Sequence, residues 1–203
     1  MKTRILALLT VAAMSVVVSA APQTFDFKDP KGVNNAVFKL DALLEAITGS
    51  ANGISGTVTF DPADPGATKG KIVVATSSLQ VPNSTMKEHL HGNQWLDVQA
   101  NKEITFEARS LANVKTTGEN TTADVTGTLT IKGVAKEVTA PVKFSYLKDK
   151  LSQRVPNQKG DLLVIRANFA IKRSDFGINP KAPADKVADT IDLTLSIAGA
   201  SPK

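Results

Sequence analysis

Apolar and polar residues alternate strictly along most of the chain, and the clearest example runs from Asp124 to Phe144. A period of two places the apolar residues of each half of this stretch on one face of a β-strand. The stretch therefore predicts an antiparallel hairpin with one buried face and one face in water. Its apolar positions are Val125, Gly127, Leu129 and Ile131 in the first half, and Val138, Ala140, Val142 and Phe144 in the second.

The numbering of these apolar positions restricts how the two halves pair. They are odd in the first half and even in the second, so the turn must hold an even number of residues. Pairing Lys132 with Glu137 meets this condition and sets opposite charges across the strands. It predicts a four-residue turn, Gly133 to Lys136. The facing pairs would then include Gly127 with Val142, and Leu129 with Ala140.

The same alternation predicts further strands, whereas two short segments have helical spacing. The first helical segment is Asp41 to Ile47, with Asp41 as a possible N-cap. The second is Asn83 to Gly92, in which Asn83 or Ser84 is the N-cap and Gly92 ends the helix. Two polar segments, Ala112 to Asn120 and Lys148 to Lys159, are predicted to be connections. The further strands are Thr24–Phe27, Ala36–Leu40, Ile54–Phe60, Gly70–Ala75, Ile104–Arg109, Leu163–Ile171 and Ile191–Ile197.

These elements indicate an all-β fold with seven to nine strands and one or two short helices. Each alternating strand has a single apolar face, so the strands must either stack as a sandwich or close into a barrel. The pattern alone leaves both architectures open. A closed antiparallel barrel of about eight strands has an interior just large enough for a small ligand.

The N-terminus has the three parts of a secretory signal peptide. A basic start is followed by an apolar run from Ile5 to Val18 and by small residues before Pro22. We expect a signal peptide over residues 1–21, cut after Ala20 or Ala21, and a single domain over 22–203. The alternative is a buried N-terminal helix. No other stretch approaches transmembrane length, so the sequence predicts an exported, periplasmic protein without a transmembrane segment.

Composition and charge exclude several classes of function. The 203-residue chain has no cysteine, which excludes a lipoprotein anchor and means that the fold relies on its core rather than on disulfide bonds. Its formal net charge is +5, and removing Lys2 and Arg4 with the leader leaves 22 basic against 19 acidic residues, or +3. This small surplus forms no basic run, so nucleic-acid binding is not predicted.

The candidates for catalysis or metal binding are few. His89 and His91 are the only histidines, and on a helix two residues so spaced point in different directions and cannot share one ion. The serine motif of hydrolases, Gly-x-Ser-x-Gly, does not occur. We therefore predict neither a metal site nor a cofactor, and no enzymatic activity.

The segment Arg173 to Gly177 allows two interpretations. In the first it is a structural turn, in which Asp175 accepts backbone N–H groups, Gly177 takes an unusual backbone conformation and Phe176 plugs the end of the fold. In the second, Arg173 lies at the mouth of a binding site and grips a phosphate or carboxylate head group.

Four segments, in this order along the chain, resemble the YceI-like proteins, which are exported, lipocalin-like, polyisoprenoid-binding domains. They are SGTVTFDP (Ser55 to Pro62), EHLHGNQWLDVQANKEITFEA (Glu88 to Ala108), GTLTIKGVAKEVTAPV (Gly127 to Val142) and RSDFGI (Arg173 to Ile178). The resemblance implies an eight-stranded antiparallel lipocalin-like barrel around an elongated apolar tunnel. It also implies a ligand that is a long-chain isoprenoid or another amphiphilic lipid.

Combining the apolar faces with this resemblance gives a candidate binding site. Arg173 is the expected contact for a head group. Two other functions stay open, an accessory protein or enzyme that acts on such a lipid or quinone, and a structural domain with a filled core. Oligomerisation is possible. The residues expected to line the tunnel are Trp95, Phe106, Leu129, Phe144, Phe169 and Phe176.

Overall fold

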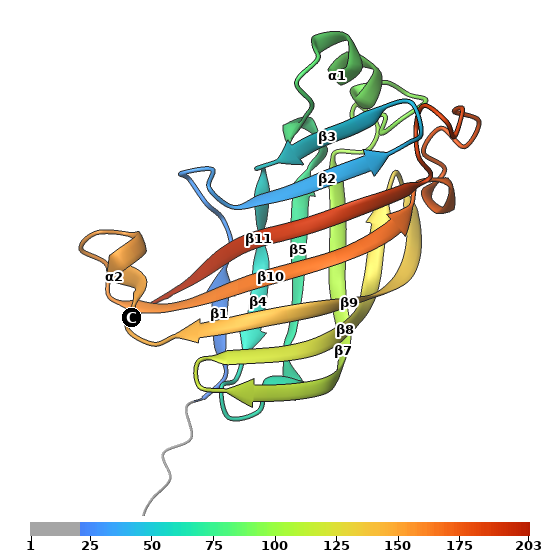
Figure 1. Cartoon of the computed structure of the whole chain (residues 1–203). Helices are drawn as coiled ribbons and strands as arrows, with labels where there is room; N and C mark the ends of the chain where they lie inside the picture. Colours follow the sequence, from blue (N-terminus) through green and yellow to red (C-terminus); the bar gives the residue numbers. More distant parts are fainter. Residues whose placement is uncertain (1–20) are drawn as a thin grey trace, which may run out of the picture.

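The computed structural model describes residues 21–203, in which one antiparallel sheet curls into a closed barrel (Figure 1). Eight strands of this part form the ring, in the order β1-β4-β5-β7-β8-β9-β10-β11, and Asp26 of β1 pairs with Ala200 of β11 to close it. The expected eight-stranded lipocalin-like barrel is confirmed. Residues 1–20, and with them nearly all of the predicted signal peptide, lie outside the described residues. The ring strands are β1 (Gln23–Asp26), β4 (Ile54–Phe60), β5 (Lys69–Ala75), β7 (Glu103–Thr117), β8 (Asn120–Ile131), β9 (Val134–Leu147), β10 (Gly160–Lys172) and β11 (Thr190–Pro202).

Three further strands extend the sheet beyond the ring at one end. Strand β11 changes partner along its length, because Ala200 pairs with β1 whereas Asp192 to Ser196 pair with β2. Strands β2 and β3 then form a hairpin that runs alongside β11 (Figure 1), and the short β6 pairs with the end of β3. These strands are β2 (Asn35–Asp41), β3 (Ala46–Ala51) and β6 (Leu79–Gln80).

The predicted helix over Asp41 to Ile47 is wrong, because this segment is the tip of the β2–β3 hairpin. The N–H of Ala42 donates to the carbonyl of Glu45 at 2.9 Å, and Ile47 pairs with Leu40 across the hairpin. A helix this short is marginal on its own, so the contacts of its surroundings decide its conformation. The β-branched residues of β3 instead pair with an adjacent strand.

The register predicted for the β8–β9 hairpin is also wrong, although its two faces are right. Ile131 pairs with Val134, so the turn is the two-residue Lys132-Gly133, with φ values of 51° and 75°. These angles fit the tight turn that matches the twist of paired strands. The pairing of Lys132 with Glu137 would add only about 0.5 kcal/mol, as surface ion pairs do. Gly127 therefore faces Val138, and Leu129 faces Lys136.

The predicted connection over Ala112 to Asn120 is mostly strand. Strand β7 continues to Thr117, which pairs with Asn120 across a turn at Gly118. Irregular pairing next to Asn113, whose φ is 54°, bends the strand, and the side-chain amide of Asn113 donates to Asp124. Threonine-rich sequence of this kind favours extended backbone despite its polarity.

The helices of residues 21–203 are short. Helix α1 (Ser84–His91) confirms the second predicted helix, since the side chain of Asn83 accepts the N–H of Met86 at 2.9 Å and Gly92 follows the last turn. Helix α2 (Leu151–Arg154) lies in the predicted polar connection and buries Leu151 completely. None of these helices is long and apolar enough to cross a membrane. Single 3₁₀ turns are η1 (Pro65–Ala67), η2 (Thr76–Ser78) and η3 (Ser174–Phe176).

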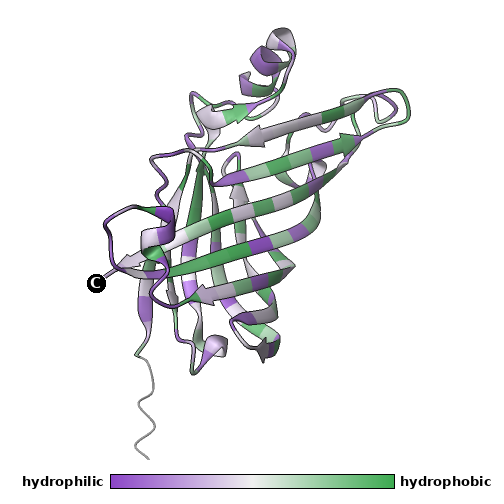
Figure 2. Ribbon diagram, turned by 60° about the vertical axis from the view of Figure 1, so that its left-hand side comes forward, coloured by the Kyte–Doolittle hydropathy of each residue, from purple (hydrophilic) through white to green (hydrophobic). Residues whose placement is uncertain are grey.

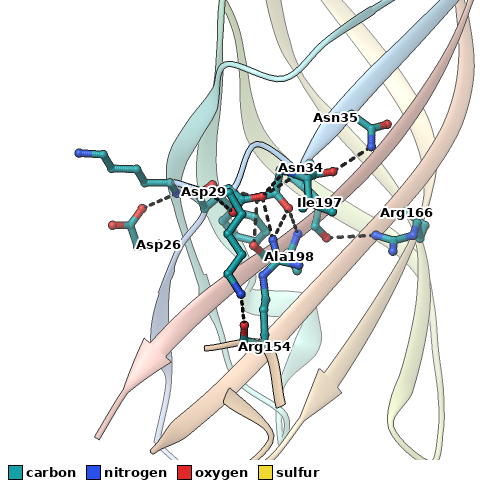
Figure 3. Close-up of polar contacts among 12 residues, drawn as sticks. Asp26, Asp29, Asn34, Asn35, Arg154, Arg166, Ile197 and Ala198 are labelled. Atoms are coloured by element: carbon teal, nitrogen blue, oxygen red, sulfur yellow. Dashed lines mark hydrogen bonds and ion pairs between the residues drawn. The ribbon is translucent and has the colours of Figure 1, made fainter. Parts of the chain in front are cut away.

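A buried polar cluster fixes the connection between β1 and β2 (Figure 3). The carboxylate of Asp29 accepts three backbone N–H groups and lies 3.0 Å from the Arg154 guanidinium of α2. The side-chain amide of Asn34 exchanges hydrogen bonds with the backbone of Ala198 in β11. Burial by itself favours the protonated form of Asp29, but these hydrogen bonds outweigh it and lower its pKa. The cluster ties α2, β11 and the β1–β2 connection together.

Candidate functional site

The barrel contains a cavity of about 390 Å³. The buried residues around it form two separate clusters rather than one core. The first cluster lies toward α1 and η3 and includes Phe38, Leu96 and Phe176, and the second lies toward the β1–β11 closure and includes Phe25 and Phe60. Apolar and polar residues alternate along the strands between them (Figure 2).

Small side chains on three ring strands leave room between the two clusters. Ala108 of β7, Ala140 of β9 and Ala167 of β10 all line the cavity. Protein interiors are normally filled to the density of organic crystals. Alanines that face a cavity from three strands therefore mark places where the core of this barrel is not filled.

The lining is almost entirely apolar. Among the described residues that form it, five have polar or charged side chains, namely Glu45, Thr68, His89, Arg173 and Thr194. Glu45, His89 and Thr194 are exposed as well as lining the cavity. Glu45 at the tip of the β2–β3 hairpin and His89 in α1 mark where the cavity reaches the surface at the α1 end of the barrel. We call this opening the mouth.

Helix α1 and the turn after it cover part of the mouth. Met86, His89 and Leu90 on the helix, and Trp95 after it, line the cavity. One hydrogen bond within this segment and one to the preceding strand β6 fix its position. The N–H of Leu96 donates to the carbonyl of Leu90 at 3.1 Å, and the ring Nε2 of His91 lies 2.9 Å from the carbonyl oxygen of Leu79.

Five of the six apolar residues predicted for the binding site line the cavity. They come from four ring strands and from the turn after α1. The sixth, Phe176, does not line it. This residue lies in η3, is 1% exposed and packs within the first cluster. The five lining residues are Trp95, Phe106, Leu129, Phe144 and Phe169.

Arg173 lines the cavity, but its guanidinium is fully occupied by backbone. The side chain is 2% exposed, and its five N–H groups are the whole of its donor capacity. All five donate to carbonyl groups of the segment that joins η3 to β11, which excludes a hydrogen bond to a ligand head group in this arrangement. The acceptors are the carbonyl oxygens of Ala188, Ile178, Asn179, Ala182 and Val187.

Arg173 therefore folds the segment between η3 and β11. Gly177 has φ of 65°, as the structural interpretation expected, but the carboxylate that receives the N–H of Ser174 belongs to Asp189 rather than Asp175. Partial burial favours the protonated form of Asp189, but the hydrogen bonds from Ser174 and the charge of Arg173 outweigh it and lower its pKa.

Sequence reasoning missed the part of the lining that β2, β3 and α1 supply. Leu40 and Ile47 line the cavity from the two strands of the hairpin, and Met86 and Leu90 line it from α1. Alternation continues from Phe38 through Leu40 and resumes at Ile47 after the turn. This was the signal for a hairpin, which the helical spacing of Leu43, Leu44 and Ile47 obscured.

The described residues do not bring metal ligands together. In residues 21–203, no group of three or more His, Asp or Glu side chains is placed to hold a metal ion. His89 faces the mouth, whereas the ring of His91 is bonded to the backbone of Leu79. Among the described residues, the charged or titratable side chains that line the cavity are Glu45 in the β2–β3 turn, His89 in α1 and Arg173 just before η3.

Comparison with known proteins agrees with this architecture. Residues 25–198 match the model of the YceI-like domain. A UPF0312 protein of Pseudomonas paraeruginosa is 32% identical over 151 residues, which cover 74% of this chain and 72% of that protein. Among solved structures, BcnA of Burkholderia cenocepacia has a TM-score of 0.66 and 23% identity, covering 81% of this chain and 95% of its own. A domain of Saccharophagus degradans described as polyisoprenoid-binding has a TM-score of 0.64 and 11% identity, covering 90% of this chain and all of its own. This chain belongs to the YceI-like family.

Proposed function

We propose that this protein is a periplasmic carrier that sequesters one long-chain isoprenoid, or a related amphiphilic lipid, in the cavity of its barrel. The observation that carries the proposal is the cavity of about 390 Å³ with a lining that is apolar apart from five residues. The description of the Saccharophagus degradans domain as polyisoprenoid-binding supports the same class of ligand. The signal-like N-terminus supports export to the periplasm.

An apolar chain needs no specific chemistry to bind in such a cavity. Each methylene removed from water contributes about 0.8 kcal/mol, so a dozen contribute about 10 kcal/mol before the cost of immobilising the ligand. A lining of Phe106, Leu129 and Phe169 presents only dispersion contacts to the chain. We therefore expect tight binding with broad selectivity, set by the length and thickness of the chain.

The polar end of the ligand belongs at the mouth, where Glu45 and His89 line the cavity. The guanidinium of Arg173 has no donor left for it. A head group at the mouth stays in contact with water and avoids the cost of burying an unpaired polar group. The lining pairs no nucleophile with a base among the described residues, which favours binding over catalysis.

The proposal is tested by titrating the protein with prenyl alcohols, prenyl phosphates and fatty acids while following the fluorescence of Trp95. This residue is the only tryptophan of the chain and lines the cavity, so it reports directly on occupancy. We expect a saturable change at one ligand per chain. His89→Ala should bind within about twofold of the unaltered protein, because chain burial dominates affinity. Fluorescence that ignores every probe, with no ligand retained after gel filtration, would overturn the proposal.

A further inference from the structure

Two leucine side chains are exposed to solvent at the tip of the β2–β3 hairpin. Leu43 is 88% exposed and Leu44 is 62% exposed, and the hairpin that bears them projects from the barrel (Figure 2). Leucines this exposed bury little area within the barrel and so contribute little to its core. Their position thus calls for something outside the barrel that covers them.

The tip is held in a fixed position beside another exposed segment. The N–H of Leu44 donates to the carbonyl of Asp185 at 2.8 Å, and the turn is closed by the hydrogen bond between Ala42 and Glu45. Pro183 and Ala184, which precede Asp185, are also exposed. In Figure 1 the hairpin tip lies next to the loop before β11. We call Leu43, Leu44, Pro183 and Ala184 the apolar tip.

The apolar tip lies at the rim of the mouth. Glu45 follows Leu44 directly and lines the cavity, and Val187 lines it from the segment that carries Asp185. Leu40 and Ile47 line the cavity further down the same hairpin. A surface that covered the tip would therefore also face the opening.

The size and charge of the tip distinguish between possible partners. A stable protein interface buries about 800 Å² on each side, much more than two leucines and two small residues offer. The two segments that carry the tip, residues 39–45 and 181–186, have balanced charges, with Lys39, Lys181 and Lys186 against Asp41, Glu45 and Asp185. A small apolar projection with a neutral rim fits the interface of a lipid bilayer, where leucine side chains insert among the acyl chains.

We propose that the apolar tip docks this protein on the surface of a lipid bilayer with the mouth of the cavity toward the lipid. The inference rests on the proposed carrier function, because a lipid that the protein carries resides in membranes before it is taken up and after it is released. Docked in this way, the protein takes up or releases a lipid tail at the mouth without passing it through water. Insertion of only two leucines makes the contact weak and reversible, as a carrier requires.

The test is flotation of the exported protein with phosphatidylcholine vesicles at millimolar lipid, after intact mass has verified that the N-terminal leader is absent. The unaltered protein should float with the vesicles. L43D/L44D should lower the partition coefficient at least about a hundredfold, about tenfold for each leucine removed. Val33→Asp is the matched control, because Val33 is 59% exposed but lies in the β1–β2 connection, at the opposite end of β2 from the hairpin tip. It should float like the unaltered protein.

Two further measurements, the salt dependence of flotation and the rate of lipid uptake from vesicles, distinguish docking through the leucines from electrostatic binding. Because the charges at the rim cancel, flotation should change less than about twofold when salt is raised or anionic lipid is added. L43D/L44D should slow the uptake of a fluorescent prenyl lipid from vesicles, yet bind the same lipid from dilute solution with unchanged affinity. If the unaltered protein and L43D/L44D both failed to bind the lipid from solution while flotation still depended on the leucines, the carrier function would be refuted and the docking would stand. Equal flotation of the unaltered protein and L43D/L44D, or flotation of neither, would overturn the docking on lipid. Another protein would then be the partner of the tip.

Discussion

The ring of Phe106 in β7 lies against the backbone of Gly127 in the neighbouring strand β8. A Cβ atom at position 127 would lie 2.6 Å from the Cζ atom of Phe106, closer than real side chains approach. Gly127 is thus small because the ring occupies the space above it, and it does not line the cavity. Phe106 does line the cavity and packs against both core clusters, so its position sets the width of the cavity between them.

Gly127→Ala should narrow the cavity and destabilise the barrel. The added Cβ must displace the ring of Phe106 toward the cavity, and it also meets the carbonyl oxygen of Glu107. Overpacking of this kind costs about 1–3 kcal/mol. The free energy of unfolding in urea and the affinity for a prenyl probe should both fall. Unchanged affinity would mean that the ring does not set the width of the cavity.

Phe106→Ala should have the opposite effect on capacity. Removing the ring joins space on either side of it, so the variant should accept bulkier or longer chains. Truncating a buried phenylalanine lowers the free energy of unfolding by about 3–5 kcal/mol. We expect a value near the lower end of this range, because one side of Phe106 already faces the cavity. The ratio of affinities for a long and a short prenyl alcohol is the measurement. A ratio equal to that of the unaltered protein would contradict the prediction.

Ala140→Leu should fill part of the cavity at little cost in stability. Ala140 is 4% exposed and lines the cavity, whereas Ala123 in the adjacent strand is 5% exposed, belongs to the second cluster and does not line it. Leucine at 140 has space to occupy, so its free energy of unfolding should change by less than about 1 kcal/mol. Leucine at position 123 has no such space, so overpacking should lower the free energy of unfolding of Ala123→Leu by about 1–3 kcal/mol.

The same pair of variants distinguishes a carrier from a domain with a filled core. Ala140→Leu should weaken lipid binding, while Ala123→Leu should bind normally at temperatures at which it is folded. Equal destabilisation of the two variants would mean that both alanines are packed alike and that the interior holds no usable space.

The buried carboxylate of Asp161 should make stability fall in acid. It accepts hydrogen bonds from Tyr146 at 2.7 Å and from the N–H of Asp149 at 2.8 Å, and it lies 2.9 Å from the ammonium of Lys203. Burial favours the protonated form, but these contacts outweigh it and lower the pKa of Asp161 from 3.8 to about 2. The contacts therefore stabilise the fold above pH 4, and this contribution is lost as the pH falls through 2.

The size of this acid effect is about 2 kcal/mol. Free energies of unfolding measured from pH 5 to pH 2 should fall more steeply for the unaltered protein than for Asp161→Asn, which is less stable at pH 5. Asp64→Asn, an exposed carboxylate beside η1, serves as the control and should follow the unaltered protein. Parallel curves for Asp161→Asn and the unaltered protein would refute the assignment.

Arg173→Lys should loosen the segment between η3 and β11. Lysine keeps the charge but has three donors, so at least two of the five carbonyl contacts are lost. Hydrogen bonds to a buried charged group contribute about 1.5–3 kcal/mol each, and we expect a loss of at least about 3 kcal/mol. Hydrogen exchange should rise over residues 173–189. Arg166→Lys, on the exposed face of β10, is the control and should change little.

A head-group role for Arg173 makes a different prediction. In that case Arg173→Lys would leave stability near that of Arg166→Lys and would selectively weaken binding of prenyl phosphates relative to prenyl alcohols. That result would contradict the structural role assigned to its guanidinium.

The sequence predicted the wall of the barrel well, because alternation is a local property of each strand. Val125 to Ile131 and Leu163 to Ile171 are strands with the expected buried faces. The register of the β8–β9 hairpin was not predictable from charge pairing, since Lys132 takes a turn conformation and donates to the carbonyl of Asn93 instead. Twist and turn geometry outweigh a surface ion pair.

The candidate site was predictable only in part, because whether a space is empty depends on side chains that meet across the barrel. Alternation alone places Gly127, Ala140 and Ala167 alike on the apolar faces of their strands. Only the packing distinguishes Gly127, which Phe106 covers, from the two alanines that face the cavity. The role of Arg173 likewise depends on five carbonyl groups from a segment with no periodic pattern.

Native mass spectrometry of the protein isolated from its own cells, without detergent, tests the carrier function most directly. We predict a species heavier than the bare chain by the mass of one lipid, which organic extraction removes and identifies as a prenyl or acyl compound. Ala140→Leu prepared in the same way should carry less of it, whereas Ala123→Leu should carry it normally. A spectrum that contains only the bare chain for the unaltered protein, together with a Trp95 signal that ignores added prenyl and acyl lipids, would contradict the account.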